Sequence, residues 1–252
     1  MSRLEGRKIL VVGAGTRPTD DPDAPAGNGR AIAVTAATEG ATVACADLDV
    51  VAARETATLV RDAGGHAQVI VADVSDPDAC TAMVAEAADL LDGLDGVVVN
   101  VGIGAGRWLG TTSVDEWDHV FDVNVRAHFL TCRAALPLLS DGGSIVLISS
   151  VAGLRPGSTI PAYDASKAAL AGLCRHVAFE GSRRGIRANV VAPGLIDRRR
   201  DNRALQWTLQ AEKPLSPRQT LVLEWRARSV RDPIPLYQYK AQSLGAFIQQ
   251  QF

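Results

Sequence analysis

A tyrosine and a lysine lie four residues apart in the stretch YDASK, as Tyr163 and Lys167. In a helix this spacing places both side chains on one face. A free phenol has a pKa of about 10 and is a poor base at neutral pH, but a nearby ammonium group stabilises the phenolate and lowers that pKa. Ser150 ends an apolar run 13 residues earlier, where its hydroxyl could bind a substrate oxygen. Together the three residues predict general acid–base chemistry.

A glycine-rich segment, VVGAGT, follows the first apolar run. Gly13 and Gly15 allow a sharp turn and a close approach of the backbone to a pyrophosphate. The free N–H groups of a following helix would also bind that anion. The helix begins only at Gly27 and Gly29, in GNGRAIA. A glycine-rich loop alone is a weak signal, since any tight strand–helix turn favours glycine.

An insert over residues 17–26 separates this loop from its helix. Two interpretations are open. Either the insert is a solvated surface loop, since loops tolerate added length, or it is a flap that covers the cofactor phosphates. In the second case Arg17 would be a phosphate contact.

Acidic residues end the next two apolar runs. Asp47 could accept hydrogen bonds from a ribose diol and would repel a 2′-phosphate, which favours NAD over NADP. A helix-capping role for Asp47 is the alternative. Asp73 and Val74 could hold an adenine edge, although DVSD by itself is a helix N-cap pattern.

Residues 1–197 alternate apolar runs with helical patterns. The strands are predicted at 7–14, 41–47, 66–73, 95–102, 142–150 and 186–193. The helices are predicted at 29–39, 50–63, 75–91, 113–139 and 161–183. Near-continuous apolar strands separated by helices predict an α/β fold with a single Rossmann-like, doubly wound parallel sheet and helices on both faces. In such a sheet ligands bind beyond the carboxyl ends of the strands.

Over residues 7–197 this combination resembles the short-chain dehydrogenase/reductase family. The resemblance implies an NAD(P)-dependent oxidoreductase that interconverts a secondary alcohol and a ketone, with NAD as the expected cofactor. It also implies a catalytic set of four residues: Asn124, Ser150, Tyr163 and Lys167. Tyr163 would be the general acid/base, and Lys167 would lower its pKa and hold the nicotinamide ribose. Ser150 would orient the reacting oxygen, and Asn124 would support a water.

The resemblance implies further cofactor contacts. The family's NNAG motif is here VNVG, in which Val99 replaces the first asparagine. Its Pro-Gly motif is Pro193–Gly194, and Ile196 is expected near the nicotinamide carboxamide. The full implied set of cofactor-binding residues is Gly13, Gly15, Gly27, Gly29, Asp47, Asp73, Val74, Asn100, Gly102, Tyr163, Lys167, Pro193, Gly194 and Ile196.

The composition changes near residue 198. Residues 1–197 hold 22 of the 23 glycines, and the last 55 residues carry ten Lys+Arg against four Asp+Glu. We therefore predict a catalytic domain over 1–197 and a divergent basic segment over 198–252 that is not an independent domain. Helices are possible at 221–230 and 241–250.

The family pattern also stops near residue 198. A divergent C-terminus and a shifted reading frame both explain this, and the simultaneous change of composition and pattern favours the second. The family's last strand and substrate lid would then be missing or replaced. A non-catalytic nucleotide-binding protein is therefore the alternative function.

The remaining features exclude several classes of protein. The net charge of -2, the 47% hydrophobic residues and the absence of a long apolar run indicate a globular cytoplasmic protein rather than a membrane protein. The four cysteines and four histidines show no metal-ligand spacing, so no metal is expected. No nucleic-acid motif accompanies the basic tail, although an interaction protein that uses this tail is a third possibility. We expect a small-molecule alcohol or ketone substrate and a homodimer or homotetramer formed through helices 113–139 and 161–183.

Overall fold

The computed structural model describes residues 2–17, 19–20, 25–155 and 158–194, together with strands at 203–216, 219–231 and 239–250. Contacts within the chain divide it into two compact units, 1–194 and 195–252.

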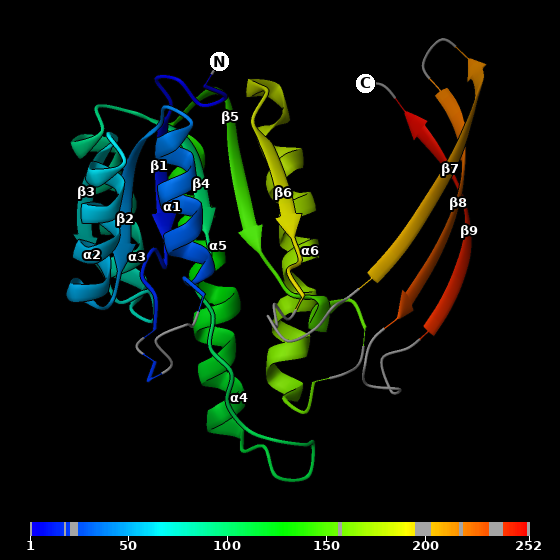
Figure 1. Ribbon diagram of the computed structural model, residues 1–252, viewed down its shortest axis with the longest axis horizontal. Coiled ribbons are helices and arrows are strands. Elements are labelled where there is room, and N and C mark those ends of the chain that lie inside the picture. Colours follow the sequence, from blue (N-terminus) through cyan, green and yellow to red (C-terminus); the bar gives the residue numbers. More distant parts are fainter. Residues whose placement is uncertain are drawn as a thin grey trace. The chain divides into compact units, whose positions relative to one another are not determined.

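The first unit is a parallel sheet of six strands in the order β3-β2-β1-β4-β5-β6, with helices on both faces (Figure 1). Its strands are β1 (Lys8–Val12), β2 (Thr42–Asp47), β3 (His66–Val71), β4 (Leu94–Val99), β5 (Leu139–Ile148) and β6 (Arg187–Val191). Its α-helices are α1 (Asn28–Thr38), α2 (Val50–Asp62), α3 (Pro77–Leu90), α4 (Val114–Phe121), α5 (Ala127–Leu138) and α6 (Pro161–Gly181). The predicted doubly wound, Rossmann-like fold is confirmed.

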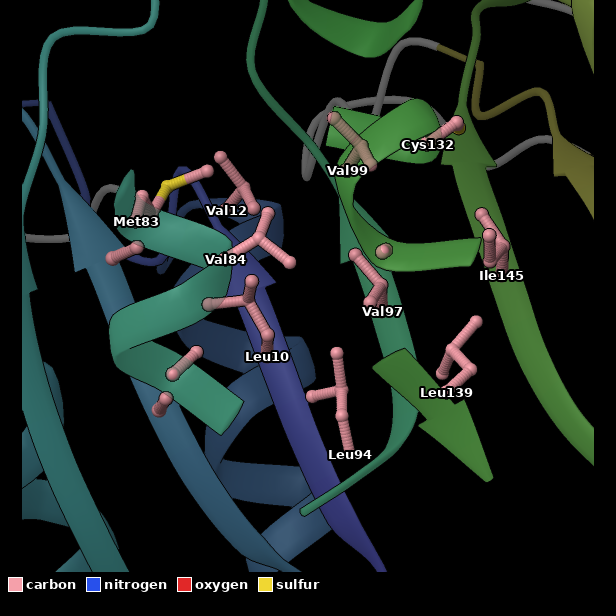
Figure 2. Close-up of a cluster of buried hydrophobic side chains, with 14 of the residues drawn as sticks. Leu10, Val12, Met83, Val84, Leu94, Val97, Val99, Cys132, Leu139 and Ile145 are labelled. Carbon is pink, nitrogen blue, oxygen red and sulfur yellow. The ribbon is translucent and has the colours of Figure 1, made fainter. Parts of the chain in front are cut away.

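Continuous apolar strands give this sheet two cores, because successive side chains point to opposite faces. Leu10 and Val12 of β1 pack with residues of α3, α5 and α6, whereas Ile9 and Val11 pack with residues of α1 and α2. Figure 2 shows the first of these cores, in which α3 lies over β1 and its neighbours. The two cores hold the strands rigidly and fix where their carboxyl ends lie.

The sheet changes direction between β1 and β4. Strands β2 and β3 are added in turn on one side of β1, and β4 then pairs with the other side of β1. At such a switch point the connections leave a crevice beyond the carboxyl ends of the two central strands, and ligands bind there.

The helix predicted over 113–139 is interrupted. Ser113 and Glu116 form the predicted capping box, and α4 begins at Val114. A π-helical turn over Asp122–Arg126 then separates α4 from α5. Such turns often occur at functional sites, and Asn124 lies in this one.

The second unit differs from the sequence prediction. Its strands β7 (Arg203–Ser216), β8 (Gln219–Arg231) and β9 (Tyr239–Gln250) form an antiparallel sheet in the order β7-β8-β9. The helices predicted at 221–230 and 241–250 are therefore wrong. In LEWRAR, apolar and polar residues alternate with a period of two, which is the strand pattern rather than the helical one.

The parallel sheet ends at β6. Among the residues that the structure describes, no strand pairs with the outer side of β6. Ala188 and Val190 pack on the core beside α6, whereas Arg187, Asn189 and Val191 are exposed on the other face. The described part of the chain therefore leaves this edge of the sheet open.

Candidate active site

Helix α6 brings Tyr163 and Lys167 together as predicted. The helix begins with Pro161, whose fixed φ and missing N–H suit the first helical position. The Lys167 ammonium nitrogen lies 5.8 Å from the centroid of the Tyr163 ring. A positive charge is therefore held beside the phenol.

Backbone carbonyls hold the Lys167 ammonium in place. Its Nζ donates to the carbonyl oxygens of Val101 at 3.2 Å and Ile148 at 3.0 Å. The side chain is buried, with 3% of its surface exposed. These bonds fix the ammonium between the ends of β4 and β5.

Burial shifts the titration of this site. It lowers the pKa of Lys167 from 10.5 to about 8, so the side chain is still mostly charged at neutral pH. His128, on α5, is completely buried, and burial followed by the charge of Lys167 lowers its pKa to about 3. His128 is therefore neutral and adds no second charge.

The depressed pKa of Lys167 predicts a pH dependence of stability. Between pH 8 and pH 10.5 the unfolded chain keeps the lysine proton and the folded chain loses it, so the stability of the fold rises with pH in that window. The gap between the two pKa values corresponds to about 3 kcal/mol. We expect wild type to gain this amount relative to Lys167→Met, measured by urea unfolding across the window. Parallel pH profiles for the two proteins would contradict the prediction.

Asn124 ties three elements together from inside the π-helical turn. Its Oδ1 accepts a hydrogen bond from Ile103 N at 2.8 Å, and its Nδ2 donates to Ile103 O and to Ser166 Oγ, each at 2.9 Å. Ser166 Oγ donates in turn to the Tyr163 carbonyl at 2.8 Å. Asn124 thus links the loop after β4 to the first turn of α6. The water that it is predicted to support stays a prediction.

Ser166 is a site residue that sequence reasoning missed. It is buried, and it connects Asn124 to the backbone of Tyr163. The signal was available, because Ser166 lies inside the YDASK stretch next to Lys167.

The two serines after β5 have different environments. Ser149 is buried, and its hydroxyl donates to the Lys167 carbonyl at 2.6 Å. Ser150 is half-buried, and its hydroxyl accepts a bond from Ala152 N at 3.2 Å. Ser149 thus anchors α6 to the sheet, and Ser150 is the more accessible hydroxyl at this strand end.

A cleft of about 770 Å³ lies at the carboxyl ends of β1, β2 and β4. The predicted cofactor residues that line it are Gly13, Gly15, Gly27, Asp47, Asp73, Val74, Asn100 and Gly102. Gly29 is buried beneath the loop. Pro193 and Gly194 lie beside the turn after β5, where Val151 N donates to Pro193 O at 3.0 Å. Ile196 lies outside the described residues.

Asp47 lies in the cleft with its carboxylate against the glycine-rich loop. Its Oδ2 accepts from Gly15 N at 2.7 Å and its Oδ1 from Asp49 N at 3.1 Å. Asp49, rather than Asp47, caps α2, so the alternative role of Asp47 as a helix cap is wrong.

Asp73 lies at the end of β3 in the same cleft. It accepts a bond from Ser75 N at 2.9 Å, and hydrogen bonds from Ser75 lower its pKa. Asp76, the last residue of DVSD, is the N-cap of α3. Asp73 therefore shapes the turn before α3, and its predicted contact with adenine stays a prediction.

The N-terminus of α1, beside the glycine-rich loop, presents backbone donors to the cleft. Gly13 turns with a φ of +77°, and its carbonyl accepts from Asn100 Nδ2 at 2.8 Å. The N-terminus of α1 has no side-chain cap and no acidic residue in its first turn, so its N–H groups are available to an anion. These donors, together with the Asp47 carboxylate, fit the diphosphate and a ribose diol of a dinucleotide.

The base of the insert is closed by a bond from Gly27 N to Thr16 Oγ1 at 2.9 Å. Residues 18 and 21–24 of the insert lie outside the described residues, so the predicted flap is not tested.

The fold and the cleft define a Rossmann-like α/β protein whose ligand site lies at the switch point of the sheet. A family model described as enoyl-(acyl carrier protein) reductase matches residues 24–220. The chain belongs to the short-chain dehydrogenase/reductase family.

Several relatives support this assignment. The chain is 36% identical over 199 residues to the 3beta-hydroxysteroid dehydrogenase of Mediterraneibacter gnavus, covering 78% of this chain and 68% of that protein. It is 38% identical over 206 residues to the human (3R)-3-hydroxyacyl-CoA dehydrogenase, covering 77% and 75%. A dehydrogenase/reductase from Sinorhizobium meliloti superimposes with a TM-score of 0.69 at 37% identity, covering 76% and 73%.

Two absences apply to the described part of the chain. It contains no helix long and apolar enough to cross a membrane. It also contains no group of three or more His, Cys, Asp or Glu side chains arranged to hold a metal ion.

Proposed function

We propose that this protein is an NAD-dependent oxidoreductase that interconverts a secondary alcohol and a ketone, with Tyr163 as the general acid/base. The observation that best supports this proposal is the position of the buried Lys167 ammonium, 5.8 Å from the centroid of the Tyr163 ring. Lys167 thus holds a cation beside the ring of the residue that would carry the proton.

The residues around the reacting hydroxyl have separate proposed roles. Tyr163 removes the proton of the alcohol in oxidation and returns it in ketone reduction. Ser150 orients the oxygen that gains or loses this proton. Asn124 and Ser166 are positioning residues, because their hydrogen bonds fix the backbone of Tyr163 against the loop after β4.

The cleft residues would hold the dinucleotide. The loop at Gly13 and Gly15, with the N-terminus of α1, would bind the diphosphate, and Asp47 would bind the adenosine ribose. When bound, the nicotinamide supplies a carbon that accepts or donates hydride. The Asp47 carboxylate would repel a 2′-phosphate, so we propose NAD rather than NADP.

The proposal is tested by titrating the full chain with NAD and then following NADH formation with a panel of secondary alcohols. The panel includes a 3-hydroxysteroid and a 3-hydroxyacyl thioester, because the relatives named above are dehydrogenases of such compounds. NAD binding with turnover of at least one alcohol is expected. NAD binding without turnover of any alcohol or ketone would favour a non-catalytic nucleotide-binding protein, which the open edge of β6 makes the second candidate. No binding of NAD would contradict both.

We also propose that the protein is a cytoplasmic homodimer or homotetramer. Large apolar side chains on α5 and α6 support assembly, since Phe129 is 46% exposed and Phe179 is 75% exposed. Light scattering should give a mass of two or four chains. A monomer at all concentrations would contradict this prediction.

A further inference from the structure

Two basic side chains, Arg17 and His119, are among the described residues that line the cleft. Among the described residues that line it, Arg17 is the single arginine or lysine. The carboxylates that line it belong to Asp47, Asp49 and Asp73. A dinucleotide carries two negative charges on its diphosphate, and Arg17, which cannot lose its charge, is the side chain of the cleft best suited to bind that group.

The guanidinium of Arg17 spans two loops. Its Nη2 donates to the carbonyl oxygen of Gly102 at 3.0 Å. Arg17 follows the glycine-rich loop after β1, and Gly102 lies in the loop after β4. Arg17 therefore reaches across the switch point of the sheet, over the crevice between its two central strands.

The contacts of the two loops place Arg17 between the two ends of the site. On the β1 side, Gly15 N donates to Asp47, the residue that would bind the adenosine ribose. On the β4 side, a Cβ atom on Gly102 would lie 2.8 Å from Lys167 Nζ, so this glycine touches the residue beside Tyr163. In a dinucleotide, the diphosphate joins the adenosine ribose to the nicotinamide ribose. The guanidinium thus lies between the two ends of the site that the diphosphate of a bound dinucleotide would join.

The donors of Arg17 are available to an anion. A guanidinium carries five N–H donors, and one of them is used by the bond to Gly102. Within the described residues, no carboxylate forms an ion pair with Arg17. A planar guanidinium with free donors is suited to bidentate binding of phosphate oxygens.

We propose that Arg17, the first residue of the insert, binds the diphosphate of the dinucleotide together with the N-terminus of α1. This inference rests on the proposed function, because it assumes that the cleft binds a dinucleotide. It assigns a binding role to the described start of the insert.

Calorimetric titration of Arg17→Gln with ADP-ribose and with adenosine tests the proposal. Arg17 is exposed, so the variant should fold, and thermal unfolding checks this. Loss of charge-assisted hydrogen bonds should weaken ADP-ribose binding by about 10- to 100-fold. Adenosine has no phosphate, so its affinity should be unchanged. Arg17→Lys keeps the charge without the planar fork and should weaken ADP-ribose binding less than Arg17→Gln does.

Arg54→Gln is the matched control, because Arg54 is an exposed arginine on α2 that does not line the cleft. If Arg17→Gln and Arg54→Gln bind ADP-ribose equally well, the role of Arg17 is overturned while the proposed function stands. An equal loss of adenosine affinity in Arg17→Gln would also overturn it, since Arg17 would then act through the shape of the cleft. If wild type binds no ADP-ribose and no NAD, the proposed function itself fails.

Discussion

Replacing Tyr163 by phenylalanine is expected to lower kcat for alcohol oxidation by about 10²- to 10⁴-fold, the usual contribution of a general acid–base group. The substitution removes the hydroxyl and keeps the ring. The ring contact with Lys167 Nζ at 5.8 Å would therefore survive. Steady-state kinetics with the best alcohol of the panel measures the effect.

In the Tyr163→Phe variant, NAD binding and folding should be affected far less than turnover. The dissociation constant for NAD should change far less than kcat, because the N-terminus of α1 and Asp47, which would bind the diphosphate and the adenosine ribose, are left unchanged. Thr38→Val, in α1, likewise removes one hydroxyl, which donates to Thr35 O and does not line the cleft, and this variant should keep full turnover. A Tyr163→Phe enzyme that retains most of the wild-type kcat would show that another group moves the proton.

Replacing Gly29 by alanine is expected to disrupt both the fold and the cofactor cleft. A Cβ atom at this position would lie 1.8 Å from the carbonyl oxygen of Gly13 and 2.8 Å from Asn100 Nδ2. Because the nearest atom belongs to the backbone, α1 must move away from the glycine-rich loop. Such overpacking costs about 1–3 kcal/mol and more when backbone shifts. We expect a lower midpoint of urea unfolding and a loss of NAD affinity of more than about tenfold, since the donors of α1 move with the helix.

Gly172→Ala provides a matched control in a second helix. Gly172 lies inside α6, where a Cβ atom would meet only Arg175 Nη2, at 4.0 Å. Removing a glycine from the interior of a helix should stabilise the protein by about 0.5–1 kcal/mol. The two substitutions are thus expected to change stability in opposite directions. If Gly29→Ala is as stable as wild type and binds NAD equally well, the close packing of α1 on the loop has no functional consequence.

The sequence allowed the sheet to be predicted because its signals are local and repeated. Each strand of the first unit is an apolar run bounded by turn residues, and the helices between them have caps such as the Ser113 and Glu116 box. The same locality made the YDASK pair predictable, since a spacing of four residues fixes which side chains share a helix face.

Features that depend on tertiary contacts were not predicted. The π-helical turn around Asn124 has no glycine or proline to mark it, because its geometry accompanies the bonds of Asn124 to Ile103 and Ser166. Asp49 as the cap of α2 was missed because Asp47 and Asp49 are both plausible from sequence. Parts of β8 and β9 were predicted as helices, although the alternation in LEWRAR favours a strand.

The location of Arg17 also required the structure. The sequence shows only that an arginine begins an insert, whereas its bond to Gly102 joins two loops that are 85 residues apart. Long-range pairings of this kind follow from the strand order, which places β1 beside β4.

The central claim is hydride transfer at the Tyr163–Lys167 site, and an isotope label tests it most directly. The full chain is incubated with NAD and a secondary alcohol of the panel that carries deuterium on its carbinol carbon. NMR of the recovered cofactor should show one deuterium on the reduced nicotinamide ring, at a single face. A reduced cofactor without the label, or an alcohol that loses its deuterium to water, would contradict the account.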